Sequence, residues 1–150
     1  MDKSQRITID FYIRQNWHKL QRMYNQKSQN YDISISVGYI LLMITKEGIP
    51  STQLGPKMGM EPTSLSRTLK TMEEDGLIRR EMDKKDKRKV LIFLTPLGVD
   101  KRRIARDVVL DFDDRLVSSI PKNKLKVYFE VMQKVDEFIE SELENMEKQA

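Results

Sequence analysis

The chain has 150 residues, the usual size of one domain and too few for two ordinary independent domains. It contains no Cys and one His, which excludes disulfides, thiolate nucleophiles, zinc fingers and His-rich metal sites, and we expect neither a metal nor a cofactor. No apolar run approaches the roughly 18 to 20 residues that span a bilayer, and the start of the chain lacks a signal-peptide core. These features predict a cytoplasmic protein with no membrane partner.

The net charge of +4 is unevenly distributed. Residues 48–106 hold fourteen Lys and Arg against eight Asp and Glu, whereas residues 107–150 hold six against eleven. Residues 1–47 hold seven against four. A basic middle followed by an acidic end indicates that the middle meets a polyanion such as nucleic acid.

Two helices are predicted before residue 50. From about residue 6 to residue 24, apolar residues recur three and four positions apart, which is typical of an amphipathic helix. Ser34 is the expected N-cap of a second helix that is apolar on most of its surface and ends at Gly48. The second helix is therefore expected in the centre of the fold.

The next two helices are short and closely spaced. Ser51 is expected to cap a helix over residues 52–58, closed by Gly59 in the left-handed conformation. Pro62 fits the first position of a fourth helix, which stops at Gly76. Two short helices joined by a turn that contains Gly are typical of a helix-turn-helix.

After Gly76 the period of the apolar residues changes from about 3.6 to 2. Residues 77–82 and 90–94 are expected to form the two strands of a hairpin. Its tip, residues 83–89, carries five cations and two anions. A helix-turn-helix followed by a two-stranded hairpin is a winged helix.

Two long helices complete the chain. Thr95 and Pro96 are expected to start one that ends near residues 118–121, and a second is expected over about residues 122–146. The apolar stripes of the first and last helices either pair within one chain or join two copies. The predicted fold class is mainly α (α+β): one domain over residues 1–150, with a winged helix at 34–95 between candidate dimerisation helices at 1–30 and 96–150.

The fourth helix has a face suited to DNA. With Leu65 and Leu69 buried, its opposite face carries small hydroxyls and cations, at Thr63, Ser64, Ser66, Arg67 and Lys70. Hydroxyls bond phosphates or bases at close approach, and Arg bonds guanine through two hydrogen bonds. The alternative is an ordinary solvated helix face.

Three segments carry a resemblance to a known family. They are residues 64–69 (Ser-Leu-Ser-Arg-Thr-Leu) running on to 73–78 (Glu-Glu-Asp-Gly-Leu-Ile), residues 83–88 (Asp-Lys-Lys-Asp-Lys-Arg) and residues 94–98 (Leu-Thr-Pro-Leu-Gly). Together with the helix order, they make the stretch from Ser51 to Gly98 similar to the MarR family of bacterial transcriptional regulators. The resemblance extends over nearly the whole chain.

The resemblance implies a homodimer that reads a pseudo-palindromic operator of double-stranded DNA. It places the fourth helix in the major groove and Arg88 in the minor groove, with Asp86 steadying Arg88. The loop residues themselves indicate that Asp83 and Asp86 stabilise the hairpin tip by capping the turn and pairing with a neighbouring cation. At position 85 a Lys stands where Arg is common in the family. The candidate DNA-contacting residues are Thr52, Gln53, Thr63, Ser64, Ser66, Arg67, Lys70, Lys85, Lys87 and Arg88.

Many family members release DNA when a small aromatic or phenolic molecule binds between the dimerisation helices and the winged helix. The resemblance makes Trp17, His18, Tyr39 and Met43 candidate contacts of such an effector. The simpler interpretation is that Trp17 and Met43 are core residues and that His18 is an ordinary histidine. Because the chain has no Cys, thiol oxidation is excluded as a trigger.

We expect a DNA-binding transcriptional regulator, and specifically a repressor that responds to a ligand. The alternative is a winged-helix interaction or architectural module without sequence-specific readout. Without Cys or a second His, and with no Gly-rich phosphate loop, no set of residues indicates a reaction, so an enzyme is not expected.

Overall fold

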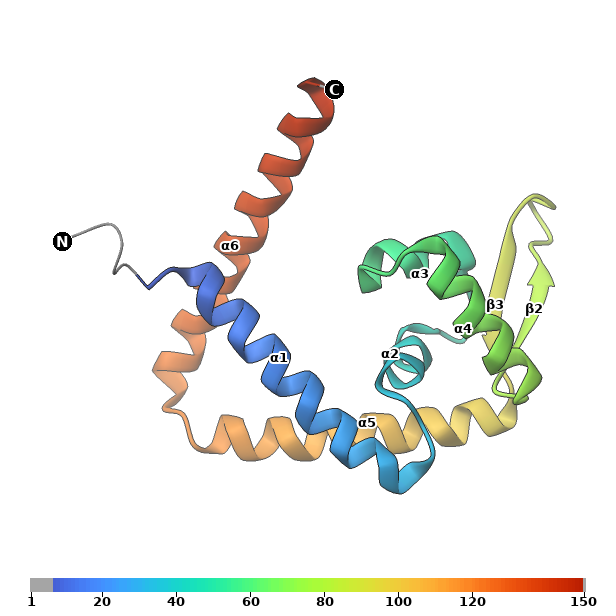
Figure 1. The fold of residues 1–150 in the computed structure, drawn as a ribbon, viewed down its shortest axis with the longest axis horizontal. Helices are drawn as coiled ribbons and strands as arrows, with labels where there is room; N and C mark the ends of the chain where they lie inside the picture. The colour runs from blue at the N-terminus through green and yellow to red at the C-terminus, as the bar shows by residue number, and fades with distance from the viewer. Residues whose placement is uncertain (1–6, 150) are drawn as a thin grey trace. The chain divides into compact units, whose positions relative to one another are not determined.

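The computed structural model describes residues 7–149, which form helices and one small sheet in two compact units that divide after Val108. In chain order the elements are α1 (Ile9–Ser28), η2 (Gln29–Tyr31), α2 (Ile35–Met43), β1 (Ile49–Pro50), α3 (Ser51–Met58), α4 (Pro62–Glu74), β2 (Ile78–Met82), β3 (Val90–Leu94), α5 (Pro96–Ser118) and α6 (Lys122–Gln149) (Figure 1). This is the predicted winged helix with long flanking helices. No helix of the described residues is both long enough and apolar enough to cross a membrane.

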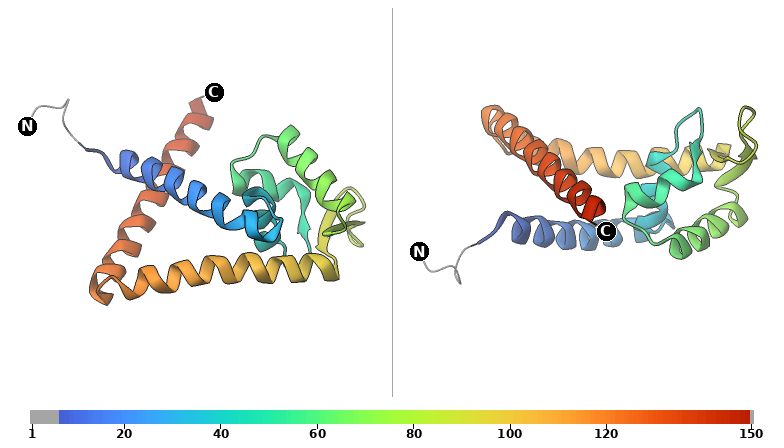
Figure 2. Two further views of the ribbon diagram at one scale, coloured as in Figure 1. Left: turned by 60° about the horizontal axis from the view of Figure 1, so that its bottom comes forward. Right: turned by 90° about the horizontal axis from the view of Figure 1, so that it is seen from above.

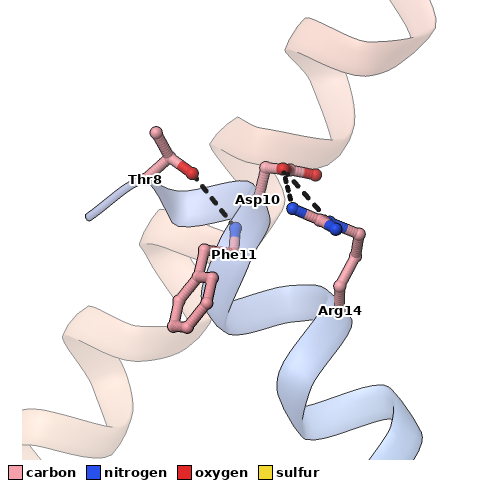
Figure 3. Close-up of polar contacts among 4 residues, drawn as sticks. All are labelled: Thr8, Asp10, Phe11 and Arg14. Carbon is pink, nitrogen blue, oxygen red and sulfur yellow. Dashed lines mark hydrogen bonds and ion pairs between the residues drawn. The ribbon is translucent and has the colours of Figure 1, made fainter. Parts of the chain in front are cut away.

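The first helix, α1, begins with a side-chain cap. The hydroxyl of Thr8 accepts a hydrogen bond from the backbone N–H of Phe11 at 3.2 Å (Figure 3). Asp10, in the first turn, accepts from Arg14 one turn later at 3.0 Å (Figure 3). The Thr8 hydroxyl gives a partner to a backbone N–H that has none within the helix, and the Asp10 carboxylate interacts favourably with the positive N-terminal end of the helix dipole. The Asp10–Arg14 pair, four residues apart, adds to the stability of the first turns. No residue of α1 is buried in the single chain.

The central helix, α2, starts where the sequence predicts and ends earlier. The Ser34 hydroxyl accepts from the backbone N–H of Val37 at 3.2 Å, which confirms the cap. The helix ends at Met43 and not at Gly48, because Ile44 is extended and fully buried. A tight turn closed by a 3.1 Å bond from the Gly48 N–H to the Thr45 carbonyl then leads into β1.

The helix-turn-helix consists of α3 and α4. Pro50 occupies the N-cap position of α3, so the prediction that Ser51 is the cap is wrong, and Ser51 is the first helical residue. Gly59 closes α3 with a φ of 59°, as predicted. Pro62 is the first residue of α4, also as predicted, because a proline at that position loses no helical hydrogen bond.

The sheet has three antiparallel strands in the order β1-β3-β2. The hairpin is confirmed, with Ile78 opposite Leu94 and Met82 opposite Val90. The two-residue strand β1 pairs Ile49 with Ile92. The sheet therefore attaches the hairpin to the segment that precedes α3.

The hydrophobic core lies in the first unit. Its eleven buried residues are Ile40, Leu41, Ile44, Ile49, Leu54, Leu65, Leu69, Met72, Leu77, Ile78 and Ile92. In the second unit, by contrast, no residue among 109–149 is buried. Folding of the winged helix thus rests on its own core, whereas the second unit has no core of its own.

The central position of Ile92 gives a test of this core. Ile92→Ala is expected to lower the free energy of unfolding by about 2–5 kcal/mol, because Ile92 is fully buried between β1 and β2. The control Met82→Ala, at a side chain that is 67% exposed, should change it by less than about 0.5 kcal/mol. Urea denaturation followed by circular dichroism measures both, and equal effects would contradict this assignment of the core.

Candidate nucleic-acid interface

Helix α4 is amphipathic, with one apolar face and one polar face. Leu65, Leu69 and Met72 are buried at i, i+4 and i+7 and fix the rotation of the helix against the core. The opposite face is exposed at all five predicted positions, Thr63, Ser64, Ser66, Arg67 and Lys70. Lys70 makes a loose ion pair with Glu74 at 3.8 Å. The start of α4 therefore presents hydroxyls and a guanidinium to a ligand.

The hairpin tip is organised by two aspartates. The Asp83 carboxylate accepts hydrogen bonds from the backbone N–H of Lys85 at 2.7 Å and of Asp86 at 3.3 Å. The bond from Lys85, followed by that from Asp86, lowers the pKa of Asp83. Asp86 accepts in turn from the backbone N–H of Arg88 at 3.1 Å. These contacts bend the basic loop into a defined turn.

The cationic side chains of the tip point into solvent. Lys85 and Lys87 are exposed, and the Arg88 side chain is 97% exposed. The Arg88 Nε lies 3.9 Å from the Asp86 carboxylate, so the pair is loose and leaves the guanidinium available. The backbone of the tip is thus held in a defined turn, and its cationic side chains remain exposed to solvent.

Thr52 and Gln53, in the first turn of α3, are also exposed. An open cleft of about 690 Å³ between α3 and α4 is lined by Thr52, Ser66 and Arg80 among others. Helix α4 also runs beside the hairpin (Figures 1 and 2). All ten candidate DNA-contacting residues are therefore exposed, on three neighbouring elements of one unit.

Two arginines of β2 have roles that the sequence analysis missed. Arg80 pairs with Glu73 in the last turn of α4 at 3.1 Å, which ties the strand to that helix. Arg79 pairs with Glu81 and lies over the Phe93 ring, 4.7 Å from its centroid. The pairing of Arg80 could have been predicted from the alternation of side chains along a strand. Arg80 lies two residues after the buried Ile78, on the same face of β2, where a cation needs an acidic partner.

The candidate effector residues are only partly brought together. Trp17 of α1 stacks on Tyr39 of α2, with ring centroids 6.2 Å apart, and burial raises the pKa of Tyr39. Met43 packs against the core, which supports the simpler interpretation for that residue. Trp17 is 46% exposed and is not a core residue of the single chain. His18 is exposed, about 100° further around α1.

Residues 40–90 match the family model of the MarR family. They include every core residue except Ile92, together with the helix-turn-helix and the hairpin as far as the first residue of β3. Over this winged helix, the chain is similar to the MarR family. The chain is also 27% identical, over 77% of its own length and 81% of the other protein, to the HTH-type transcriptional regulator BilQ of Clostridium symbiosum.

Two solved structures similar to this chain are complexes with DNA. The MepR–DNA complex of Staphylococcus aureus has a TM-score of 0.79 at 19% identity and covers 88% of this chain and 96% of MepR. Streptococcus pneumoniae FabT in complex with DNA has a TM-score of 0.75 at 18% identity, with 89% and 96% covered. At these identities, the similarity shows a shared fold over most of the chain.

The Asp83 turn gives a prediction for this interface. Asp83→Ala should speed amide hydrogen exchange at Lys85 and Asp86, because both N–H groups lose their acceptor. The midpoint of global unfolding should stay unchanged, and Lys84→Ala in the same turn is the control. Exchange followed by NMR measures the effect.

The lowered pKa of Asp83 gives this turn a pH dependence. Its hydrogen bonds are fully stabilising above the pKa of an unfolded Asp, about 3.9, and are lost as the pH falls through the lower value of the folded protein. An Asp83 carboxyl that titrates at the ordinary value in NMR would show that the turn is absent in solution.

Proposed function

We propose that this protein is a transcriptional regulator that binds double-stranded DNA with α4 in the major groove and the β2–β3 hairpin in the minor groove. The observation that carries the proposal is the pairing of an exposed hydroxyl and Arg face on α4 with a cationic hairpin tip, both held by one core. Similarity to BilQ, a transcriptional regulator, supports the same function.

The dimensions of the two elements fit the two grooves. An α-helix with side chains is about 10–12 Å across, close to the roughly 12 Å width of the major groove. Thr63, Ser64 and Ser66 lie in the first turns of α4, where backbone N–H groups also attract phosphate. Arg67 is the longest donor of this face and is our candidate for reading guanine.

The hairpin suits the narrower groove. The minor groove is about 6 Å wide, and its negative potential is strongest where it is narrow. Arg88 extends from the tip with its guanidinium in solvent, and Lys85 and Lys87 are exposed in the same loop. We infer that Arg88 enters the minor groove and that the two lysines contact phosphates.

We also propose that two copies bind together. The second unit has no buried residue among 109–149, and α6 exposes a row of large apolar side chains, namely Val127, Tyr128, Phe129, Val131, Phe138, Ile139, Leu143 and Met146. In α1, Ile9, Tyr12 and Ile13 are similarly exposed. Such surfaces are normally covered, and a homodimer supplies two recognition helices for a pseudo-palindromic operator.

A dimer of this size regulates most simply by occupying DNA that the polymerase needs, so we propose a cytoplasmic repressor with no catalytic activity. The stacked pair Trp17 and Tyr39 supports a small aromatic or phenolic effector, because a further ring can pack against an exposed aromatic side chain. Isothermal calorimetry with salicylate and related phenols, on the native chain and on Trp17→Ala, tests this part of the proposal.

Two arginine variants test the DNA proposal. Arg88→Ala should weaken binding across all sequences and reduce the slope of log K against log salt by about one, because one charge contact is lost. Arg67→Ala should cost about 1–3 kcal/mol on the preferred sequence and less on others. Fluorescence anisotropy at several salt concentrations, on duplexes selected by the native chain from a random library, measures both effects.

The control for these variants is Lys148→Ala in α6, which removes one positive charge outside the candidate interface. Unchanged affinity in both arginine variants would contradict the proposed interface. Equal competition by the selected duplex and by its scrambled form would favour the alternative, a module that does not read sequence.

Association is tested separately. The native chain should sediment as two copies of the 17.7 kDa chain. Ile139→Glu should sediment as one copy, because a charge then sits in the apolar row of α6. The control Lys126→Glu places the same side chain at an exposed polar position. A single-copy native chain, or an unchanged mass for Ile139→Glu, would contradict the proposed dimer.

A further inference from the structure

The junction between the winged helix and α5 is unusually close. Gly98, in the first turn of α5, is buried, and a Cβ added to it would overlap the carbonyl oxygen of Leu77 and lie 3.0 Å from its carbonyl carbon. The obstacle is backbone, which cannot rotate away as the end of a side chain can. The backbone of α5 therefore packs directly on the residue that precedes β2.

Thr95 holds the same junction through hydrogen bonds. Its hydroxyl donates to the carbonyl of Gly76 and accepts from the N–H of Gly98 at 3.0 Å. Its backbone N–H donates to the Leu77 carbonyl at 3.1 Å. One side chain thus caps α5 and binds it to the segment between α4 and β2.

Two further contacts hold α5 along its next turns. The Lys101 ammonium donates to the backbone carbonyl of Tyr31 at 3.0 Å. A Cβ on Gly38 of α2 would lie 3.9 Å from the Cβ of Ala105, so the two helices approach closely without a clash at that point. Contacts spread from Thr95 to Ala105 restrict the direction of α5, not only its starting point.

Direction matters because α5 is long. It runs without interruption for 23 residues (Figure 2), about 35 Å at 1.5 Å per residue. A tilt of about 5° at its start moves its far end by about 3 Å, close to the roughly 3.4 Å rise of one base pair. In a dimer, the angle at this junction is therefore converted into the distance between the two recognition helices.

We propose that Thr95 and Gly98 form a rigid joint that selects the spacing between the two operator half-sites. This inference rests on the proposed dimeric DNA binding and adds two positioning residues that lie outside the candidate DNA-contacting set. Neither reads a base. Both act by fixing how α5 leaves the winged helix, and hence which half-site separation both recognition helices reach at once.

The experiment compares the duplexes that the native chain and its variants select. Each protein selects from one random duplex library, and its affinity is then measured for the native spacing, for spacings one base pair shorter and longer, and for a single half-site. The variants are Gly98→Ala, which forces the joint apart, and Thr95→Val, which removes the hydroxyl but keeps its size. Thr95→Ser restores the hydroxyl.

The matched control is Gly38→Ala, which adds the same methyl group where its nearest neighbour is at ordinary contact distance. Thermal unfolding and sedimentation are measured for every variant. Should Gly98→Ala fail to fold, Thr95→Val decides the outcome, because it introduces no clash and changes hydrogen bonds only.

We expect the variants at the joint to select the same half-site sequence as the native chain and to bind the single half-site within about twofold of it. Their preference for the native spacing over the shifted ones should fall at least about tenfold, since one base pair also rotates a half-site by about 35°. Thr95→Ser and Gly38→Ala should retain the native preference.

If both Gly98→Ala and Thr95→Val keep the native spacing preference, whatever their overall affinity, the proposal that Thr95 and Gly98 select the half-site spacing is wrong. An equal loss at every spacing and at the single half-site, which marks a merely structural role, would also overturn it. If the native chain selects no duplex at all, the proposed function itself fails, and that result is distinguishable because it does not depend on any variant.

Discussion

Helix α4 and the hairpin are held together by one apolar core, in which Leu65, Leu69 and Met72 cluster with Ile78 and Ile92. Each such side chain contributes about 1.5–3 kcal/mol by leaving water, whereas an exposed ion pair contributes about 0–1 kcal/mol. The pair between Arg80 and Glu73, with both side chains more than a third exposed, therefore adds little stability. Apolar burial sets the angle between helix and hairpin, and the ion pair limits small movements about it.

The second unit, unlike the first, has among residues 109–149 no buried core that could stabilise its helices. Isolated helices gain little stability without tertiary packing, yet no residue of α6 is buried and its apolar side chains are exposed. A chain that keeps such a surface stays helical only if something covers it. In the proposed dimer, association stabilises the second unit as well as doubling the recognition surface, and the stability of that unit then depends on the protein concentration.

Periodicity predicted the elements that an isolated segment can specify. The cap at Ser34, the start of α4 at Pro62 and the apolar face of α4 are local patterns, and the structure has them where the sequence indicates. The end of α2 was misplaced, because the burial of Ile44 in an extended conformation depends on residues far along the chain. The overlap that any side chain at position 98 would make with Leu77 is likewise invisible in the sequence, since it needs the fold to bring two backbones together. The exposure of the polar positions of α4 could be predicted residue by residue, because these positions follow directly from the buried ones. Their contact with DNA stays a prediction.

Exposure also separates the proposed DNA contacts from the residues on which folding depends. All ten candidate contacts are exposed, so replacing one of them changes the free energy of folding by less than about 0.5 kcal/mol, and a loss of binding reports a lost contact. Gly98 is buried and Thr95 is half-buried, where a substitution affects position and stability together. Substitutions in the candidate contact surface therefore leave the fold intact. Substitutions at the joint do not, because its geometry is part of the packing that holds the winged helix on α5.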